Sequence, residues 1–206
     1  AGLYGHSGDE VRAMIDELGL KAASAHVPFA ELKNEETFKT YAKLGLKYIA
    51  IPSLPEENRY EGGNFEKTIA DIKKIGKMAK TYGMQLLYHN HDFELTQKHG
   101  DKTVLDSIYS QINSDLLCPE LDLCWVHYAG CDPVEYIKKY GNIEEIIHLK
   151  DFECKNLNSG PVYGLIDGSG KDNKRDQQSD GFEFRPIGHG RQDVKALFAA
   201  MENTKI

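Results

Sequence analysis

The sequence lacks any long apolar run. Of its 206 residues, 40% are hydrophobic and 28% charged, and no segment approaches the roughly 18 to 20 consecutive apolar residues that cross a bilayer. The N-terminal AGLYGHSGDE also lacks the basic and apolar regions of a signal peptide. These absences predict a protein with no membrane partner. We expect it in the cytoplasm, or in the periplasm if a leader has been removed before Ala1.

Positive charge is also scarce, because 25 Lys and Arg residues face 32 Asp and Glu residues, for a net charge of −7. Proteins that bind nucleic acids usually neutralise phosphates with clustered Lys and Arg. The longest basic cluster, Lys171–Arg175, is interrupted by other residues and is expected to be a solvated loop. The charge balance therefore argues against a nucleic-acid partner.

The four cysteines, Cys118, Cys124, Cys131 and Cys154, form no C-x-x-C pair. This spacing weighs against a structural zinc knuckle and against a thioredoxin-like redox motif. Four cysteines in a chain of this length do not suggest a disulfide scaffold either. We expect free thiols in a reducing compartment.

Short apolar runs alternate with amphipathic segments along the chain, and this rhythm predicts the architecture. The predicted helices have clear ends: Ser7 and Glu10 have capping-box spacing, and Asp132 before Pro133 is an N-cap with proline at the first helical position. Successive strands begin roughly 25 to 40 residues apart, which fits βαβ units and a parallel sheet. The predicted strands are Lys21–Val27, Lys47–Pro52, Met84–His91, Pro119–Val126 and Ile143–Leu149.

On this rhythm alone, a doubly wound sheet and a barrel both stay open. No glycine-rich phosphate loop follows any predicted strand, which disfavours a dinucleotide-binding doubly wound fold. The rhythm breaks from Phe152 to Arg185, a polar stretch without an apolar period. We expect residues 152–190 to form a long loop, which in a barrel would lie at the catalytic face as a lid. The whole chain, 1–206, is expected to be one domain.

Polar residues gather where successive predicted strands end. His26 ends the first strand, His89 and His91 the third, and His148 and Lys150 the fifth, while Asp122 lies within the fourth. In parallel α/β folds the ligand site lies outside these strand ends. The strand period of two places His89 with His91 on one face, and His148 with Lys150 on one face.

These polar residues are candidates for a metal site. A single histidine at a strand end is more often a hydrogen-bonded structural residue than a ligand. Three such strands in order, with an Asp inside an otherwise apolar strand, bring a metal site into consideration. Imidazoles with a carboxylate suit Mn²⁺, Co²⁺, Fe²⁺ or Zn²⁺ better than Ca²⁺.

Four segments also carry a resemblance to a known family: LLYHNHDFE, LDLCWVHYAGCDPVEYIKKYG, IIHLKD and FRPIGHGRQDVKALF. They resemble the sugar phosphate isomerase/epimerase group of xylose isomerase-like barrels. The resemblance implies a (β/α)₈ barrel and a divalent metal held by an acid, an Asp, a His and a final Glu. Members interconvert or epimerise sugars by moving protons next to a metal-bound carbonyl. Others dehydrate inosose-type substrates or cleave keto-sugar derivatives.

The resemblance assigns the metal ligands residue by residue. Asp122 matches the metal-binding Asp and His148 the metal-binding His, while His89 occupies a position where many members have Glu. The expected site is therefore a divalent metal, Mn²⁺, Co²⁺, Zn²⁺ or Mg²⁺, held by His89, Asp122 and His148. The turn Gly188-His189-Gly190 matches the glycine-flanked turn of the family ahead of its last helix.

Two departures from the family pattern affect these expectations. The chain stops at Ile206, where the strand with the fourth ligand should begin, and LYGHSGDE resembles the loop after the second strand. We therefore expect a barrel without its first strands and its last strand, as in a truncated sequence. His89 also departs from the glutamate pair that serves the epimerases of this group, so a two-base epimerisation does not match the pattern.

The remaining candidate residues divide into two sets. His91, Glu94 and Lys150 are the candidate catalytic residues. The alternative for Glu94 is a position in the loop that follows the strand, and the alternative for Lys150 is pairing with Asp151. The candidate substrate-binding residues are His26, His189 and Trp125. Trp125 is expected at the carboxyl end of a strand, where its ring could pack on a sugar ring.

The resulting function is a divalent-metal-dependent isomerase or epimerase acting on a small sugar or keto-sugar. A dehydratase or lyase on an inosose or 3-keto-sugar derivative is the first alternative. A non-catalytic carbohydrate-binding barrel is the second alternative. A related multi-zinc nuclease barrel is the third, and the negative net charge argues against it. The expected partner is a small-molecule sugar, with no nucleic acid and no membrane, and a homo-oligomer stays open.

Overall fold

The computed structural model of the protein describes residues 2–143, 145–159 and 181–206. They form two compact units. The first contains the chain up to Asn90 together with Lys98–Glu120, and the second contains His91–Gln97 together with the chain from Leu121 onward. The basic cluster Lys171–Arg175 and the middle of the long loop expected over 152–190 lie outside the described residues. One domain over 1–206 stays a prediction.

A parallel sheet forms the centre of the first unit, as the βαβ rhythm predicts. Ser24–Ala25–His26 of β1 pair with residues 48–50 of β2, and residues 48–51 of β2 pair with residues 85–88 of β3. Leu87, Tyr88 and His89 of β3 then pair with Cys118, Pro119 and Glu120 of β6. The strands are β1 (Ser24–His26), β2 (Tyr48–Ile51), β3 (Gln85–His89) and β6 (Cys118–Asp122).

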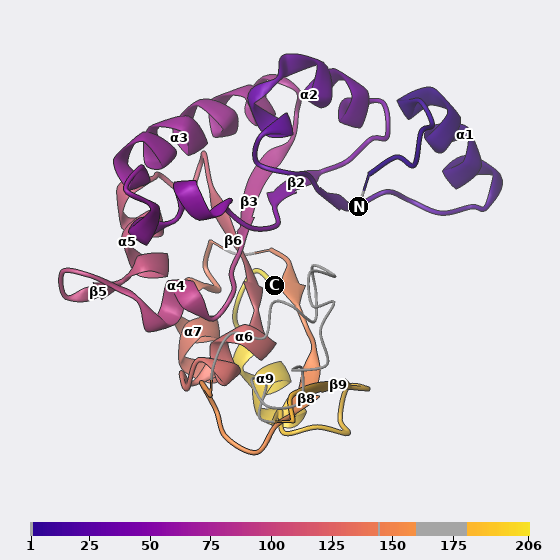
Figure 1. Ribbon diagram of the computed structural model, residues 1–206. Coiled ribbons are helices and arrows are strands. Elements are labelled where there is room, and N and C mark those ends of the chain that lie inside the picture. The colour runs from indigo at the N-terminus through magenta and orange to yellow at the C-terminus, as the bar shows by residue number, and fades with distance from the viewer. Residues whose placement is uncertain (1, 144, 160–180) are drawn as a thin grey trace. The chain divides into compact units, whose positions relative to one another are not determined.

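Helices connect these strands in the order that the apolar spacing predicts. Figure 1 shows α2 and α3 along one side of β2 and β3. A small antiparallel hairpin of β4 (Lys98–His99) and β5 (Lys102–Thr103) precedes α5 and was not predicted. The helices are α1 (Gly8–Glu17), α2 (Glu35–Ala42), α3 (Phe65–Thr81) and α5 (Val104–Gln111).

The helix ends follow the predicted capping chemistry. The Ser7 side chain accepts from the Glu10 backbone N–H, and the Glu10 carboxylate accepts from the Ser7 N–H, which completes the capping box. Asn34 caps α2 through the Glu36 N–H. Gly19 and Gly45 follow their helices with φ of 65° and 72°, a conformation that favours glycine. The capping box confirms the helix start that the spacing of Ser7 and Glu10 predicts.

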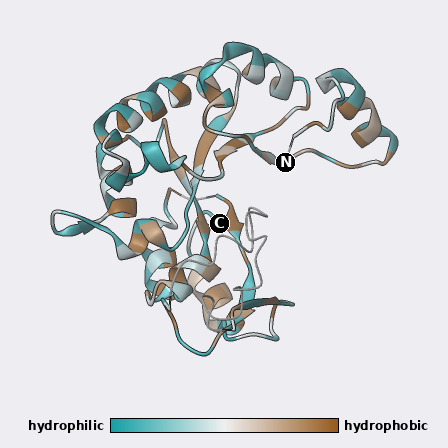
Figure 2. Ribbon diagram, viewed as in Figure 1, coloured by the Kyte–Doolittle hydropathy of each residue, from teal (hydrophilic) through white to brown (hydrophobic). Residues whose placement is uncertain are grey.

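The core of the first unit lies between the sheet and its helices. Figure 2 shows apolar colour on β2 and β3 and polar colour on the outer faces of α2 and α3. All four residues of β2 are buried, as expected for a strand in a parallel sheet. Three 3₁₀ turns, η1 (Glu31–Lys33), η2 (Glu56–Asn58) and η3 (Tyr60–Gly62), lie within the connections.

The second unit combines short helices and strands. The last two residues of β6, Leu121 and Asp122, pair in parallel with β7 (Ile147–His148). An antiparallel pair, β8 (Asp151–Glu153) with β9 (Glu183–Arg185), lies at the described ends of the segment expected to be a loop. The helices are α4 (Phe93–Thr96), α6 (Leu123–Tyr128), α7 (Pro133–Tyr140) and α9 (Val194–Met201).

All five predicted strands are shorter than expected, and for three of them the difference changes where site residues lie. The run Met84–His91 is a strand only to His89, so alternation along one strand does not place His91 beside His89. The run Pro119–Val126 is a strand only to Asp122, because the Asp122 carboxylate accepts from the Cys124 N–H and starts α6. The apolar residues after Asp122 are therefore helical. Ile143–Leu149 contributes only Ile147 and His148 to the sheet.

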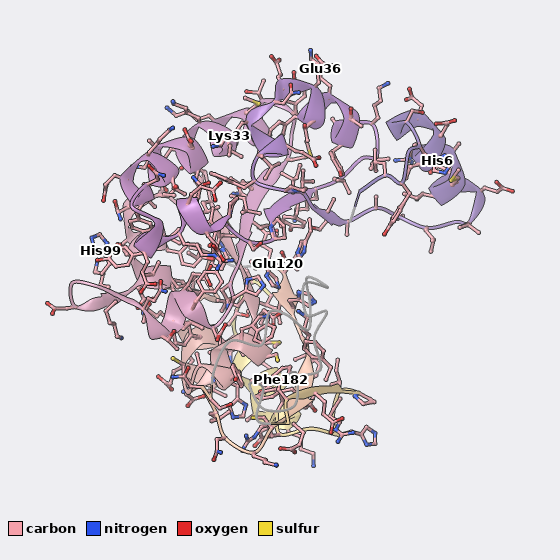
Figure 3. The ribbon with its side chains drawn as sticks, in the orientation of Figure 1. His6, Lys33, Glu36, His99, Glu120 and Phe182 are labelled. Carbon is pink, nitrogen blue, oxygen red and sulfur yellow. The ribbon has the colours of Figure 1, made fainter. Side chains whose placement is uncertain are left out.

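An aromatic cluster forms the core of the second unit. Trp125 stacks on Phe182, with ring centroids 5.5 Å apart, and Phe182 (labelled in Figure 3) stacks on Phe152 at 5.3 Å. Together with Cys124, Tyr128 and Cys154 these side chains are buried. All four cysteines of the chain are free thiols, as predicted. Within the described residues, no helix has the length and apolar character needed to cross a membrane.

Gly76, in the middle of α3, gives a test of this packing. An added Cβ would lie 2.4 Å from the carbonyl oxygen of Leu116. Alanine normally stabilises a helix by up to about 1 kcal/mol relative to glycine, but the backbone contact reverses the sign. We expect Gly76→Ala to lower the free energy of unfolding by about 1 to 3 kcal/mol. Urea unfolding measures this change.

Lys77→Ala, at the adjacent exposed position of the same helix, is the matched control. It should change the free energy of unfolding by less than about 0.5 kcal/mol. A Gly76→Ala protein as stable as the control would contradict the close packing of α3 on the segment before β6.

Candidate functional site

Asp122 is a fully buried carboxylate at the junction of β6 and α6. Its Oδ1 accepts from the Cys124 backbone N–H at 3.1 Å. Its Oδ2 lies 2.6 Å from Nζ of Lys150 and 3.6 Å from Nδ1 of His148. A buried carboxylate is costly unless charge or hydrogen bonds compensate it. The Lys150 ammonium, the imidazole and the backbone N–H supply that compensation.

His148 and Lys150 both contact Asp122 Oδ2, but β7 ends at His148, so alternation along one strand does not place Lys150 beside His148. Asp122 and His148 are also paired in register, as the last residues of β6 and β7. Lys150 forms its ion pair with Asp122 rather than with Asp151, the alternative considered from the sequence. Both partners keep some access to solvent, since the His148 side chain is 35% exposed and that of Lys150 26%.

In the first unit, a second polar group combines the last residues of β1 and β3 with Glu120 of β6. His26 Nε2 lies 2.8 Å from Oε2 of Glu120, which is labelled in Figure 3. The His26 ring meets the His89 ring edge-to-face, with centroids 5.0 Å apart. Glu120 was missed by the sequence reasoning. Its signal was its spacing, because it precedes Asp122 by two residues on a predicted strand and so shares its face.

The hydrogen bond of His89 determines which of its ring nitrogens carries the proton. Nδ1 of His89 lies 3.2 Å from the backbone carbonyl oxygen of Pro52. A carbonyl oxygen only accepts, so Nδ1–H is the donor in this bond. Nε2 then carries the lone pair. Metal-bound histidines commonly have this arrangement, with the other ring nitrogen donating to a carbonyl or a carboxylate.

The candidate catalytic residues His91 and Glu94 lie together in the second unit. Oε2 of Glu94, a residue that is 1% exposed, accepts from the His91 backbone N–H at 2.8 Å. Glu94 therefore lies buried within α4 and not in a loop after the strand, the other position considered from the sequence. The His91 ring stacks on Phe93 and lies 5.8 Å from the Trp125 ring. A chemical role for either residue stays a prediction.

Trp125 lies inside α6, three residues beyond the end of β6, and not at a strand end as expected. Its ring is fully buried against Phe182 and Tyr128. Lys150 Nζ lies 5.8 Å from the centre of the Trp125 ring. In this arrangement the ring packs in the aromatic core, which the sequence reasoning did not foresee for Trp125, and contact with a sugar stays a prediction.

Asp151 anchors the turn that contains His189. Its carboxylate accepts from four backbone N–H groups, those of Phe152, Gly188, Gly190 and Gln192, at 2.9 to 3.1 Å. Burial would raise the pKa of Asp151, but these hydrogen bonds outweigh it and hold the pKa below its ordinary value. His189 itself is exposed and lines an open hollow with Glu153, Arg185 and Pro186. Its expected role in substrate binding stays a prediction.

Parallel strands paired in chain order, β1-β2-β3-β6-β7, without the reversal of a doubly wound sheet, are typical of a (β/α) barrel. The chain belongs to the xylose isomerase-like TIM barrel family, whose model matches residues 2–206. This result confirms both the fold class and the family that the sequence motifs indicate.

The chain is also similar to curated proteins over part of its length. The chain is 33% identical to an inosose dehydratase of Clostridium perfringens over 92 residues, which is 44% of this chain and 30% of that protein. It is 22% identical to an inosose dehydratase of Geobacillus kaustophilus over 173 residues, 72% of this chain and 55% of the relative. The chain thus spans about a third to about half of the length of these relatives.

The similar structures share the fold at low identity. A sugar phosphate isomerase/epimerase from Parabacteroides distasonis has a TM-score of 0.62 and 19% identity, over 97% of this chain and 76% of that one. The IolI protein, whose crystal structure contains a zinc atom, has a TM-score of 0.66 and 18% identity. The match covers 97% of this chain and 69% of IolI.

The anchoring role of Asp151 predicts a specific pH dependence. Its pKa is lower in the folded protein than its ordinary value of 3.8. Its stabilising contribution is therefore complete above that value and is lost as the pH falls through the folded pKa. We expect Asp151→Asn to lower the free energy of unfolding by about 3 kcal/mol at pH 7, because a buried charged acceptor of four N–H groups is lost. Urea unfolding between pH 3 and 7 measures both effects.

Asp16→Asn is the control, because Asp16 is half-exposed in a surface ion pair with Arg12. Such a pair contributes only about 0 to 1 kcal/mol. If Asp151→Asn unfolded at the same urea concentration as Asp16→Asn, the carboxylate would not be the anchor of the turn.

Proposed function

We propose that this chain carries the site of a divalent-metal-dependent enzyme that removes a proton next to the carbonyl of a small sugar or keto-sugar. The observation that supports it best is the buried carboxylate of Asp122, held between His148 and Lys150 at the carboxyl end of β6. In barrels of this class, residues at that end of the strands perform the chemistry.

The donor set fits a divalent metal. Two ligands that each lie about 2.1 Å from one tetrahedral ion are about 3.4 Å apart, close to the 3.6 Å between Asp122 Oδ2 and His148 Nδ1. His89 is the third proposed ligand. It occupies the position where many family members have a Glu ligand, and its bond to Pro52 leaves the lone pair on Nε2. A bound ion would polarise the substrate carbonyl and so lower the cost of removing the neighbouring proton.

Lys150 is the proposed electrostatic residue of the site. Its ammonium, 2.6 Å from Asp122 Oδ2, is oriented by that carboxylate and by the rings of Trp125 and Phe184, each 5.8 Å away. A fixed cation at this position stabilises negative charge that develops on a substrate oxygen. His91 and Glu94 are the proposed proton-transfer candidates of the second unit.

Dehydration of an inosose is the second candidate function. It is favoured by the curated relatives, several of which, including those from Clostridium perfringens, Geobacillus kaustophilus and Clostridium tetani, are named inosose dehydratase. Isomerisation, epimerisation and dehydration of such substrates begin with the same proton removal, so the proposed site serves each. Inosose turnover that yields a dehydrated product would assign the reaction.

Asp122→Asn tests the metal site. The variant keeps the size of the side chain but loses its charge, so we expect the affinity for Mn²⁺ or Co²⁺ to fall by more than about 100-fold. His89→Ala should lower it as well. Metal analysis after dialysis and titration calorimetry measure the binding directly, without reliance on turnover.

Asp132→Asn is the matched control, because Asp132 is an exposed N-cap of α7 and asparagine caps equally well. Metal binding should be unchanged in this variant. A wild-type protein that binds far less than one equivalent of Mn²⁺, Co²⁺ or Zn²⁺ would refute the proposed function. Sugar binding that survives both Asp122→Asn and chelator would favour a non-catalytic carbohydrate-binding protein instead.

Lys150→Met separates catalysis from metal binding. The variant keeps an unbranched side chain and removes the cation that contacts Asp122 Oδ2. Metal affinity should therefore stay the same or rise, because the ion no longer competes with the ammonium. The turnover number should fall by about 100- to 1,000-fold, measured on inosose with the metal-loaded protein. Lys138→Met, at an exposed position of α7, is the control, and equal loss in both variants would exclude the role of Lys150.

A further inference from the structure

The pair of His26 and Glu120 is a polar group that the proposed metal site does not use. Glu120 is buried, with 8% of its side chain exposed, and His26 keeps 28% of its side chain exposed. His26 is the last residue of β1, and Glu120, in β6, is the register partner of His89, the last residue of β3. A barrel of this class binds its ligand at the carboxyl ends of its strands. Other ion pairs of the first unit, such as Lys43 with Asp9, lie on exposed helix surfaces instead.

The hydrogen bond between the two side chains fixes the orientation of Glu120. A carboxylate only accepts, so the proton of this bond lies on Nε2 of His26. The bond occupies Oε2, and among the described residues Oε1 accepts no hydrogen bond. A carboxylate offers about four acceptor positions. The Glu120 carboxylate is thus a fixed, charged acceptor that can accept further hydrogen bonds.

The neighbouring strand restrains the same carboxylate. Glu120 is the register partner of His89, and the His89 ring lies edge-to-face against His26. His89 is in turn tied to the carbonyl of Pro52. Three strands therefore contribute to one rigid polar group, and rigidity lowers the entropy that a ligand loses when it binds there.

We propose that Glu120, positioned by His26, binds a hydroxyl group of the sugar or inosose substrate and determines specificity for substrates that carry it. A substrate hydroxyl donates to Oε1 of Glu120, and the charge on the acceptor makes that bond roughly twice as strong as a neutral one. A site built to bind a hydroxyl rejects the analogue that lacks it, because the buried acceptor is then left without its partner. This inference rests on the proposed function and names a further residue for it.

The test compares the substrate with analogues in both wild-type and variant proteins. Metal-loaded protein is assayed with inosose and with each monodeoxy inosose, which lacks one hydroxyl. We expect wild type to prefer inosose over one of these analogues by about 100-fold in kcat/KM. In Glu120→Ala that preference should fall to less than about 3-fold, with kcat/KM for the deoxy analogue nearly unchanged.

Two further variants keep the test decisive. Glu120→Gln, which is closer to the native side chain in shape, should lose about 10-fold of the preference because its amide oxygen accepts without charge. Glu66→Gln, at an exposed position of α3, should behave as wild type. A merely structural role for the pair would lower kcat/KM for inosose and for every analogue by the same factor, and that result would overturn the proposal.

The outcomes also separate this inference from the proposed function. A wild-type protein that binds metal and turns over inosose, but whose Glu120 variants keep the full preference, refutes the hydroxyl-binding role alone. A wild-type protein that binds neither metal nor inosose in calorimetry refutes the proposed function, and the inference falls with it. Metal content of the Glu120 variants should equal that of wild type, whereas that of Asp122→Asn should not.

Discussion

The buried charge of Asp122 is the constraint on which the proposed site depends. A fully buried carboxylate is tolerated only with compensation, and the compensation organises its surroundings. One oxygen starts α6 through the Cys124 N–H, and the other fixes Lys150 beside His148. The same side chain therefore ends a strand, begins a helix and orients two charged or polar partners. A divalent ion is the kind of partner that this concentration of donors and charge suits.

Much of the architecture could be predicted because it depends on interactions between residues that are close in the sequence. The capping box of Ser7 with Glu10, the Asp132–Pro133 helix start and the spacing of apolar residues in α3 act within a few residues. Parallel pairing then follows from the alternation of strand and helix. Asp122 and His148 could be predicted as neighbours because both lie at the carboxyl ends of strands that are adjacent in a parallel sheet. The structure pairs them in register.

The predicted strand bounds were wrong where a polar side chain binds the backbone and ends an apolar strand early. LDLCWV reads as one apolar strand, but the Asp122 carboxylate caps the backbone and makes LCWVHY a helix. Trp125 is buried as a result. The run through His91 stops being a strand at His89, and the Glu94 carboxylate binds the His91 N–H in the following turn. Neither hydrogen bond has a signature in hydrophobic periodicity, because each depends on where one polar side chain lies in three dimensions.

The spacing of Glu120 and Asp122 shows how one strand register can specify several contacts together. Glu120 is the register partner of His89 in β3, and Asp122 is the register partner of His148 in β7. Because side chains alternate along a strand, a slip of β6 by one residue would turn both carboxylates toward the side that Pro119 and Leu121 now occupy. There, neither would have an imidazole or an ammonium to compensate it. The two buried acids thus disfavour the wrong register of β6. The residues that we propose for chemistry therefore also help to specify the fold.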